Sequence, residues 1–128
     1  MVRTSSKPGD PPIAWTTEYV NRSWQRLVHE APRHPEQLMI DIIPRVYRKK
    51  CDETRQVVEA TLLSEEAALH LERVPGIPAL RITRRYLDAK RHAILTTIST
   101  HPADRYAFNL NVKIDPEDER TSFTAEGL

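Results

Sequence analysis

The segment His-Pro-Ala-Asp-Arg-Tyr that begins at His101 gathers side chains that could bind a polar ligand. Pro102 fixes its own φ angle and forces His101 toward an extended backbone, and Asp104 can accept hydrogen bonds from nearby amides. The segment is therefore predicted to be a shaped corner that brings the His101 imidazole, the Arg105 guanidinium and the Tyr106 phenol to one end of a sheet. Two interpretations stay open: a structural corner, or part of a binding site.

A second group of charged side chains lies on a predicted strand, residues 79–86, with the sequence ALRITRRY. Apolar and polar residues alternate along it until the pattern shifts at Arg84. One interpretation is a solvated sheet face, and the other is a cationic patch that lines an anion pocket. Arginine suits the second role because its planar guanidinium pairs with a carboxylate or phosphate through two parallel hydrogen bonds. Arg81 is the candidate for that role.

No motif in the chain predicts a metal site or a catalytic centre. His29 and His34 are five residues apart and separated by Pro32, whereas a zinc-protease helix needs its two histidines at i and i+4. With three glycines, the chain has no glycine-rich phosphate loop, and no serine or cysteine lies in a nucleophile elbow. We therefore predict no cofactor, no metal and no enzymatic activity.

The composition predicts one soluble cytoplasmic domain. The length of 128 residues is typical of a single domain, and the net charge of +1 argues against a free-standing nucleic-acid binder. Cys51 is the sole cysteine, so no internal disulfide can form and a reducing compartment is favoured. The chain has no apolar run of about 18 residues, and its N-terminal segment lacks the apolar centre of a signal peptide.

Alternation of apolar and polar residues predicts three strands, at residues 79–86, 93–100 and 106–114. Residues 13–20 are also predicted to be a strand because they are rich in β-branched and aromatic residues, and residues 56–63 are strand-like. The last three strands are joined by short polar turns, which is typical of an antiparallel meander. Three helices are predicted between the earlier strands. Their expected start residues are Asn21, Pro35 and Ser64.

Each predicted helix has an apolar face and a stop signal. The apolar residues of the three helices are, in order, Trp24, Leu27, Val28 and Ala31; Leu38, Met39, Ile42 and Ile43; and Ala68, Leu69 and Leu71. Pro32 ends the first helix, Pro44 ends or kinks the second, and Pro75-Gly76 ends the third. The element order predicts an α+β fold in which helices pack on one face of a mainly antiparallel sheet. Residues 1–10 are predicted to be a flexible lead-in, 11–114 the domain, and 115–128 an acidic tail.

Several segments in this order and spacing resemble the UTRA domain, the effector-binding domain of the HutC/FarR branch of GntR-type bacterial transcription regulators. They are PIAWTTEYV at 12–20, LLSEEAALHL at 62–71, PGIPALRITRRY at 75–86, and the HPADRYAF corner. The resemblance covers roughly residues 10–114. It implies a chorismate lyase-like fold and a small-molecule sensor that forms a homodimer.

In that family, the effector changes the placement of an N-terminal winged helix-turn-helix on operator DNA. The resemblance implies that this chain lacks that DNA-binding domain and the family's opening helix-and-strand unit, so the UTRA-like domain would be N-terminally truncated. We therefore expect no direct DNA binding by the chain itself, and no membrane association.

The resemblance also implies which residues bind the effector. Glu18 matches the carboxylate of the family's first repeat, and Arg3 lies near the expected position of an arginine pair. Leu95 and His101 occupy the positions of a glutamate and a tyrosine in the second repeat, which argues against a sugar phosphate. With Arg81 from the cationic strand, these residues predict a pocket for a small anionic or zwitterionic metabolite with a ring or an apolar portion.

Two alternatives to a sensor remain. An orphan domain could pair with full-length regulators through an exposed sheet edge, because an unpaired strand invites another chain. A chorismate lyase-like enzyme is the other alternative, although the sequence shows no acid and base pair at a recognisable spacing.

Overall fold

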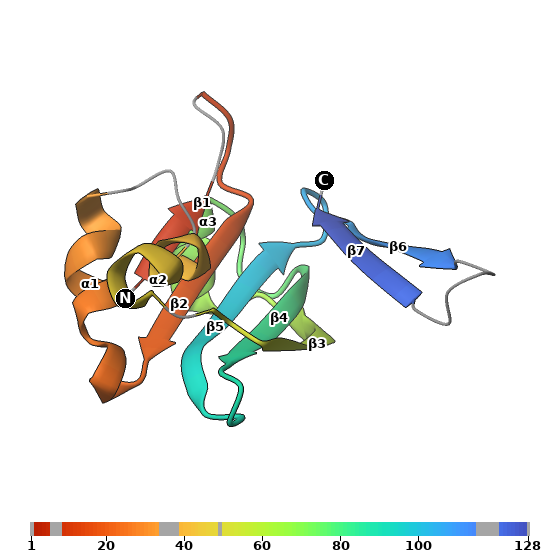
Figure 1. Cartoon of the computed structure of the whole chain (residues 1–128). Helices are drawn as coiled ribbons and strands as arrows, with labels where there is room; N and C mark the ends of the chain where they lie inside the picture. The colour runs from red at the N-terminus through yellow and green to blue at the C-terminus, as the bar shows by residue number, and fades with distance from the viewer. Residues whose placement is uncertain (1, 6–8, 34–38, 49, 115–120, 128) are drawn as a thin grey trace.

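A five-stranded antiparallel sheet forms the body of the protein in a computed structural model (Figure 1). The structure describes residues 2–5, 9–33, 39–48, 50–114 and 121–127. The strand order is β1-β2-β5-β4-β3, and each strand is antiparallel to its neighbours. The strands are β1 (Val2–Ser5), β2 (Ala14–Val20), β3 (Glu53–Leu62), β4 (Pro78–Leu87) and β5 (Ala93–Pro102).

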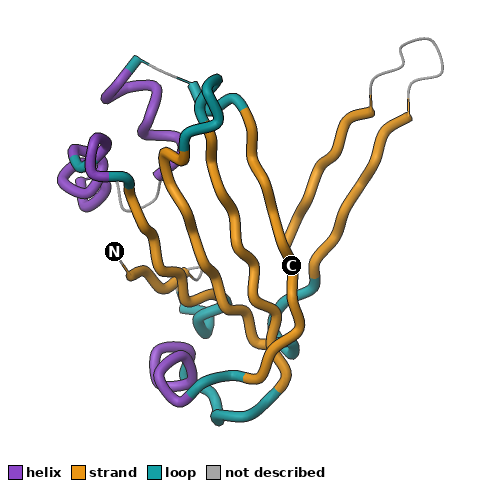
Figure 2. The backbone as a smooth tube through the Cα atoms, turned by 90° about the horizontal axis from the view of Figure 1, so that it is seen from below, coloured by secondary structure: helices purple, strands orange, loops and turns teal. Residues whose placement is uncertain are grey.

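The predicted α+β fold is confirmed, but the predicted meander is wrong in its third strand. The meander in the structure is β3-β4-β5. β6 (Phe108–Ile114) pairs instead with β7 (Thr121–Gly127), and Figure 2 shows this hairpin diverging from the main sheet. β6 has no place beside β5, because β2 and β4 already occupy both edges of β5.

Strands also occur inside the two predicted terminal segments. Within the predicted flexible lead-in, Val2–Ser5 form β1 and pair with β2. Within the predicted acidic tail, Thr121–Gly127 form β7. Local composition favoured loops at both places, and pairing with a neighbouring strand overrides such preferences.

Short helices cover both faces of the sheet, whereas we expected them on one. They are η1 (Arg22–Trp24), α1 (Arg26–Glu30), η2 (Ala31–Arg33), α2 (Met39–Tyr47) and α3 (Glu65–Leu71). α1 and α2 pack on the face to which Leu95 and Tyr86 contribute. α3 packs with Trp15 and Ala79, which belong to the opposite face because side chains alternate along a strand.

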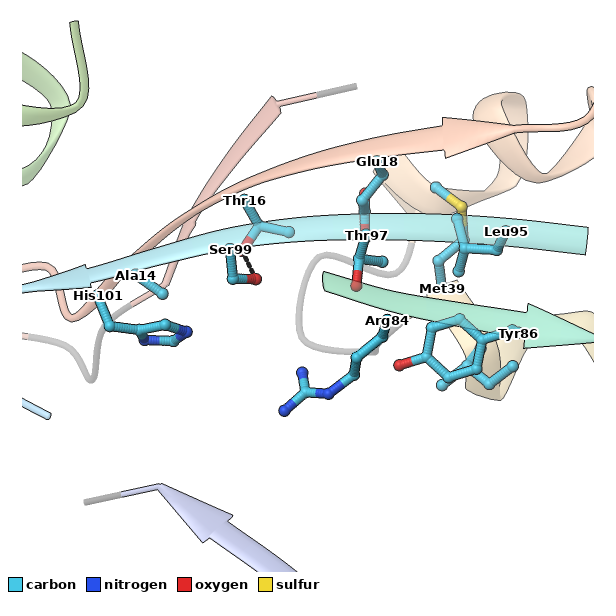
Figure 3. A pocket seen from close by; sticks show the side chains of 11 residues that line it. Ala14, Thr16, Glu18, Met39, Arg84, Tyr86, Leu95, Thr97, Ser99 and His101 are labelled. Carbon is cyan, nitrogen blue, oxygen red and sulfur yellow. Dashed lines mark hydrogen bonds between the residues drawn. The ribbon is translucent and has the colours of Figure 1, made fainter. Parts of the chain in front are cut away.

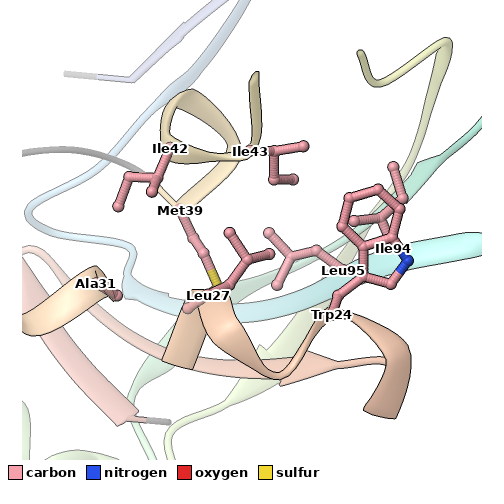
Figure 4. Packing of buried hydrophobic residues seen from close by; sticks show 8 residues of the cluster. All are labelled: Trp24, Leu27, Ala31, Met39, Ile42, Ile43, Ile94 and Leu95. Carbon is pink, nitrogen blue, oxygen red and sulfur yellow. The ribbon is translucent and has the colours of Figure 1, made fainter. Parts of the chain in front are cut away.

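The larger core cluster lies between α1, α2 and the start of β5 (Figure 4). Its buried members are Trp24, Leu27, Ala31, Met39, Ile42, Ile43, Ile94 and Leu95. Two consecutive residues of β5, Ile94 and Leu95, join this one cluster because the register slips there: Tyr86 pairs with Leu95 but Leu87 pairs with Ala93. Ile94 is the extra residue of this β-bulge, and the bulge turns its side chain toward the cluster instead of toward the opposite face of the sheet.

The predicted helix starts are confirmed at two positions. The Asn21 side chain accepts a hydrogen bond from the Ser23 amide, and the Ser64 hydroxyl accepts one from the Ala67 amide. Pro35 lies outside the described residues, and so does Leu38 of the predicted second helix face.

Two predicted helix-face residues point to solvent: Val28 is 42% exposed and Leu69 is 78% exposed. The first prediction assumed one continuous α-helix after Asn21. The segment instead alternates 3₁₀ and α turns, so its residues are not spaced at a constant 3.6 per turn and Val28 is rotated outward. The predicted stops also differ, because Pro32 lies inside η2 and α2 continues past Pro44 to Tyr47.

Candidate functional site

A pocket of about 170 Å³ lies on the face of the sheet that α2 partly covers (Figure 3). Strands β2, β4 and β5 contribute alternate residues to it, because every second side chain of a strand shares a face. Its lining residues are Ala14, Thr16 and Glu18 from β2; Arg84 and Tyr86 from β4; Leu95, Thr97, Ser99 and His101 from β5; and Met39 and Ile40 from α2.

Glu18 and Arg84 place opposite charges on either side of Thr97. In the sheet register, Thr97 stands directly opposite Glu18 on one side and Arg84 on the other. Because adjacent strands are about 4.8 Å apart, the backbones of Glu18 and Arg84 are about 10 Å apart across β5. Glu18 is only 7% exposed, and Arg84 is half-buried and donates a hydrogen bond from Nε to Oε1 of Gln56. The pocket floor therefore carries a negative and a positive end.

His101 presents a hydrogen-bond acceptor at the other end of the pocket. Its Nδ1 lies 3.1 Å from the carbonyl oxygen of Ile13, which can only accept, so in the neutral ring Nδ1 carries the proton and Nε2 the lone pair. Nε2 is buried and has no hydrogen-bond partner within the described part of the chain. Burial and, to a smaller extent, the nearby positive charge of Arg84 together lower the pKa of His101 to about 4, against the opposing effect of the Ile13 hydrogen bond. The ring is therefore neutral near pH 7.

We expect this depressed pKa to make the fold acid-sensitive. Below the unfolded-state pKa of about 6.5, the unfolded chain binds a proton at His101 that the folded chain rejects until about pH 4. The free energy of unfolding should fall as the pH is lowered through this window, by up to about 1.4 kcal/mol per pH unit. Urea unfolding of the wild type and of His101→Gln across the window measures it. Equal pH slopes in the two proteins would contradict the assignment.

The pocket also contains hydroxyl groups that can form hydrogen bonds with a ligand. The Thr16 and Ser99 hydroxyl oxygens are 2.7 Å apart and hydrogen-bond to each other. Burial raises the pKa of Tyr86, so its hydroxyl stays protonated and can donate a hydrogen bond.

The corner after β5 supports the pocket from outside. The Arg105 guanidinium donates to the carbonyl oxygens of Pro12 at 2.9 Å and Leu71 at 2.7 Å, and so joins three separate segments. The Tyr106 ring stacks on the His101 ring with 3.9 Å between centroids. The His101 imidazole and the Tyr106 phenol are therefore in contact, as predicted. The Arg105 guanidinium instead connects backbone segments through its hydrogen bonds.

Replacing Arg105 should therefore destabilise the fold. We expect Arg105→Ala to lower the free energy of unfolding by about 2–4 kcal/mol, because two part-buried carbonyl groups lose charged hydrogen-bond donors. Arg73→Ala, at a neighbouring arginine whose ion pair with Asp104 is partly exposed, is the matched control and should cost about 1 kcal/mol or less. Urea denaturation measures both, and equal losses would show that the carbonyl contacts have no special role.

Three of the five residues predicted to bind ligand line the pocket: Glu18, Leu95 and His101. Arg81 does not line this pocket. It lies on the opposite face and pairs with Glu59 at 3.2 Å, because β4 keeps strict alternation and places odd-numbered residues away from the pocket. Arg3 stands opposite Thr16 in the backbone register of β1, and its side chain is outside the described residues.

Arg84 supplies the cation of the pocket and was not among the predicted ligand-binding residues, although the alternating pattern of its strand shifts at this position. Arg84 continues the face of Leu80 and Ile82, so an unbroken two-residue period would have placed it in the pocket. The same period from His101 leads to Thr97 and Ser99. Met39 and Ile40 carried no such signal, because their contribution depends on how α2 docks.

The chain belongs to the UTRA domain family: the family model matches residues 6–107. A search of curated proteins gives no match at a significant level.

Solved structures of bacterial regulators share the fold. A GntR-family transcriptional regulator from Enterococcus faecalis V583 has a TM-score of 0.68 and 18% identity, over 86% of this chain and 76% of that one. The effector domain of PhnF from Mycobacterium smegmatis has a TM-score of 0.62 and 17% identity, over 81% and 62%. The C-terminal domain of the histidine utilization repressor from Pseudomonas syringae has a TM-score of 0.66 and 21% identity, over 82% and 72%.

Two further classes of site receive no support from the described ranges. Within them, no group of three or more histidine, cysteine, aspartate or glutamate side chains is placed to hold a metal ion. None of their helices has the length and apolar character needed to cross a membrane.

Proposed function

We propose that this domain is the effector-binding module of a HutC-type GntR-family transcription regulator, and that it binds a small zwitterionic metabolite. The observation that carries the proposal is the pocket floor, on which Glu18 and Arg84 flank Thr97. Membership of the UTRA family and the shared fold with the PhnF effector domain support the regulatory role.

The lining residues define the chemistry of the ligand. Arg84 can pair with a carboxylate, and Glu18 can accept hydrogen bonds from an ammonium group. His101 Nε2 offers a further acceptor for an N–H or O–H group. Leu95 and Met39 supply an apolar wall. A cavity of 150 Å³ holds benzene in another protein, so a pocket of about 170 Å³ suits a ligand of roughly amino-acid size.

Regulation would follow from a shift between domain arrangements. An effector that binds one arrangement better than another biases the DNA-binding domains attached to it, with a coupling free energy of about 1–3 kcal/mol. The net charge of +1 supports a division of labour in which operator DNA is bound by another domain. We propose a pair of copies as the working unit.

A thermal-shift screen tests the proposal. The panel contains amino acids and other zwitterions, simple organic acids, and sugar phosphates. We expect one or more zwitterions to raise the melting temperature, because a ligand that binds only the folded state stabilises it, and we expect sugar phosphates to leave it unchanged. Stabilisation by sugar phosphates alone would contradict the proposed ligand class, and pyruvate release from added chorismate would favour the enzyme instead.

A further inference from the structure

We infer that Gln56 is a positioning residue of the effector site, because it orients the Arg84 guanidinium so that its terminal N–H groups stay available to a carboxylate. The inference rests on the proposed effector binding and adds to it how the carboxylate of the effector is held. Gln56 stands directly opposite Arg84 in the register of β3 against β4. Arg84 Nε donates a hydrogen bond to Gln56 Oε1 at 2.5 Å. Gln56 does not line the pocket, so it acts through Arg84.

The hydrogen bond to Gln56 decides which edge of the guanidinium a ligand can use. A guanidinium pairs with a carboxylate through two parallel hydrogen bonds, either from Nε and one terminal nitrogen or from the two terminal nitrogens, Nη1 and Nη2. Because Arg84 Nε already donates to Gln56, the first edge is occupied. The terminal nitrogens of Arg84 have no hydrogen-bond partner within the ranges that the structure describes. Arg84 therefore offers its terminal edge.

The side from which Gln56 approaches leaves that terminal edge in the pocket. Gln56 lies on β3, whereas the pocket extends over β5 and β2 on the other side of β4. Figure 3 shows the Arg84 guanidinium turned away from Tyr86 and toward the His101 end of the pocket. The contribution of the Arg84 charge to the low pKa of His101 agrees with this direction. A carboxylate bound to Nη1 and Nη2 would therefore lie on the His101 side of Arg84.

Orienting Arg84 before the ligand arrives should raise the affinity for a carboxylate. An arginine side chain has many rotamers, and binding is weaker when this freedom is lost only in the complex. Gln56→Leu keeps a side chain of similar size and removes the acceptor oxygen. Because Gln56 is exposed, the substitution leaves the core intact. We expect it to weaken carboxylate binding about threefold to tenfold.

An acetate titration of the full chain, followed by two-dimensional ¹H–¹⁵N NMR, measures this effect. Acetate is the probe because it carries a carboxylate and no ammonium group, and sodium chloride at the same ionic strength is the reference. The Arg84 Nε–H signal is identified by its absence from the spectrum of Arg84→Met. Acetate should shift this signal and the Thr97 amide signal in a saturable way, with a Kd about threefold to tenfold higher in Gln56→Leu.

Glu59→Leu is the matched control. Glu59 lies on the same strand as Gln56 and accepts hydrogen bonds from Arg81, but on the opposite face of the sheet. Its replacement removes an equivalent acceptor and should leave the acetate Kd within about a factor of two, since surface ion pairs contribute little. Thermal melting confirms that each variant is folded.

The protein without any ligand tests the orientation of Arg84 separately. The Arg84 Nε–H should exchange slowly with water in the wild type and in Glu59→Leu, and it should lose this protection in Gln56→Leu. Equal exchange in the wild type and Gln56→Leu would overturn the inference, and so would an unchanged acetate Kd or no acetate-dependent shift of Arg84. If the expected results hold while no zwitterion stabilises the domain, the proposed effector class fails and the role of Gln56 in carboxylate binding stands.

Discussion

Replacing Arg84 with methionine should weaken the binding of a zwitterionic effector about tenfold to a hundredfold. The substitution keeps an unbranched apolar side chain of about the length of the arginine's aliphatic part, and it removes the cation that faces the pocket. A hydrogen bond to a charged group contributes about 1.5–3 kcal/mol, and each 1.4 kcal/mol corresponds to about a tenfold change in Kd. Isothermal titration of a zwitterion that stabilises the wild type gives the two affinities.

Arg81→Met is the matched control for this experiment. Arg81 lies on the same strand but on the opposite face, where it pairs with Glu59. Its replacement should leave the effector Kd within about a factor of two, since surface ion pairs contribute little. If Arg81→Met lost affinity for the effector while Arg84→Met kept the wild-type Kd, the effector would bind on the opposite face of the sheet, which would contradict the account.

Leu27→Ala should lower the free energy of unfolding by about 2–5 kcal/mol. Leu27 is fully buried in the cluster between α1, α2 and β5, so its truncation leaves a cavity that the neighbouring side chains can fill only in part. Because a small domain is stable by about 5–15 kcal/mol, this is a large part of the total. Chemical denaturation measures the loss.

Val28→Ala provides the comparison, because Val28 is the next residue of α1 and is 42% exposed. We expect a change of about 0.5 kcal/mol or less, as for most surface substitutions. Comparing Leu27→Ala with Val28→Ala tests whether this segment forms the succession of short 3₁₀ and α turns in the structure or the one continuous helix with both residues on its apolar face that the sequence predicts. Equal losses would mean that Val28 is also in the core.

Four strands of the main sheet could be predicted from the sequence because each of them has a local signal, whereas β1 and β7 lie in segments whose composition favours loops. Alternation located β4 and β5 to within a few residues, residue composition located β2 and β3, and the Asn21 and Ser64 caps marked two helix starts. The hairpin β6–β7 could not be predicted in this way. Its strand pattern is visible, but the choice of partner depends on which sheet edges are already occupied.

The site was only partly predictable for a similar reason. Glu18, Leu95 and His101 could be placed through the resemblance of their segments to a family, whereas Arg81 was chosen as the cation and Arg84 is the arginine that lines the pocket. Three arginines, Arg81, Arg84 and Arg85, lie on the strand that supplies the cation, and composition does not distinguish them. The face of Arg84 follows from the register of β4 against β5, which is a long-range property of the fold.

The pocket's ability to bind a zwitterion can be tested most directly by two-dimensional ¹H–¹⁵N NMR of the labelled domain, with zwitterions, organic acids and sugar phosphates added in turn. We predict that a zwitterion shifts the amide signals of Glu18, Arg84, Thr97 and His101, while those of Arg81 and Glu59 hardly move. Shifts confined to the β6–β7 hairpin or to the β3 edge, or no shift with any zwitterion, would contradict the account.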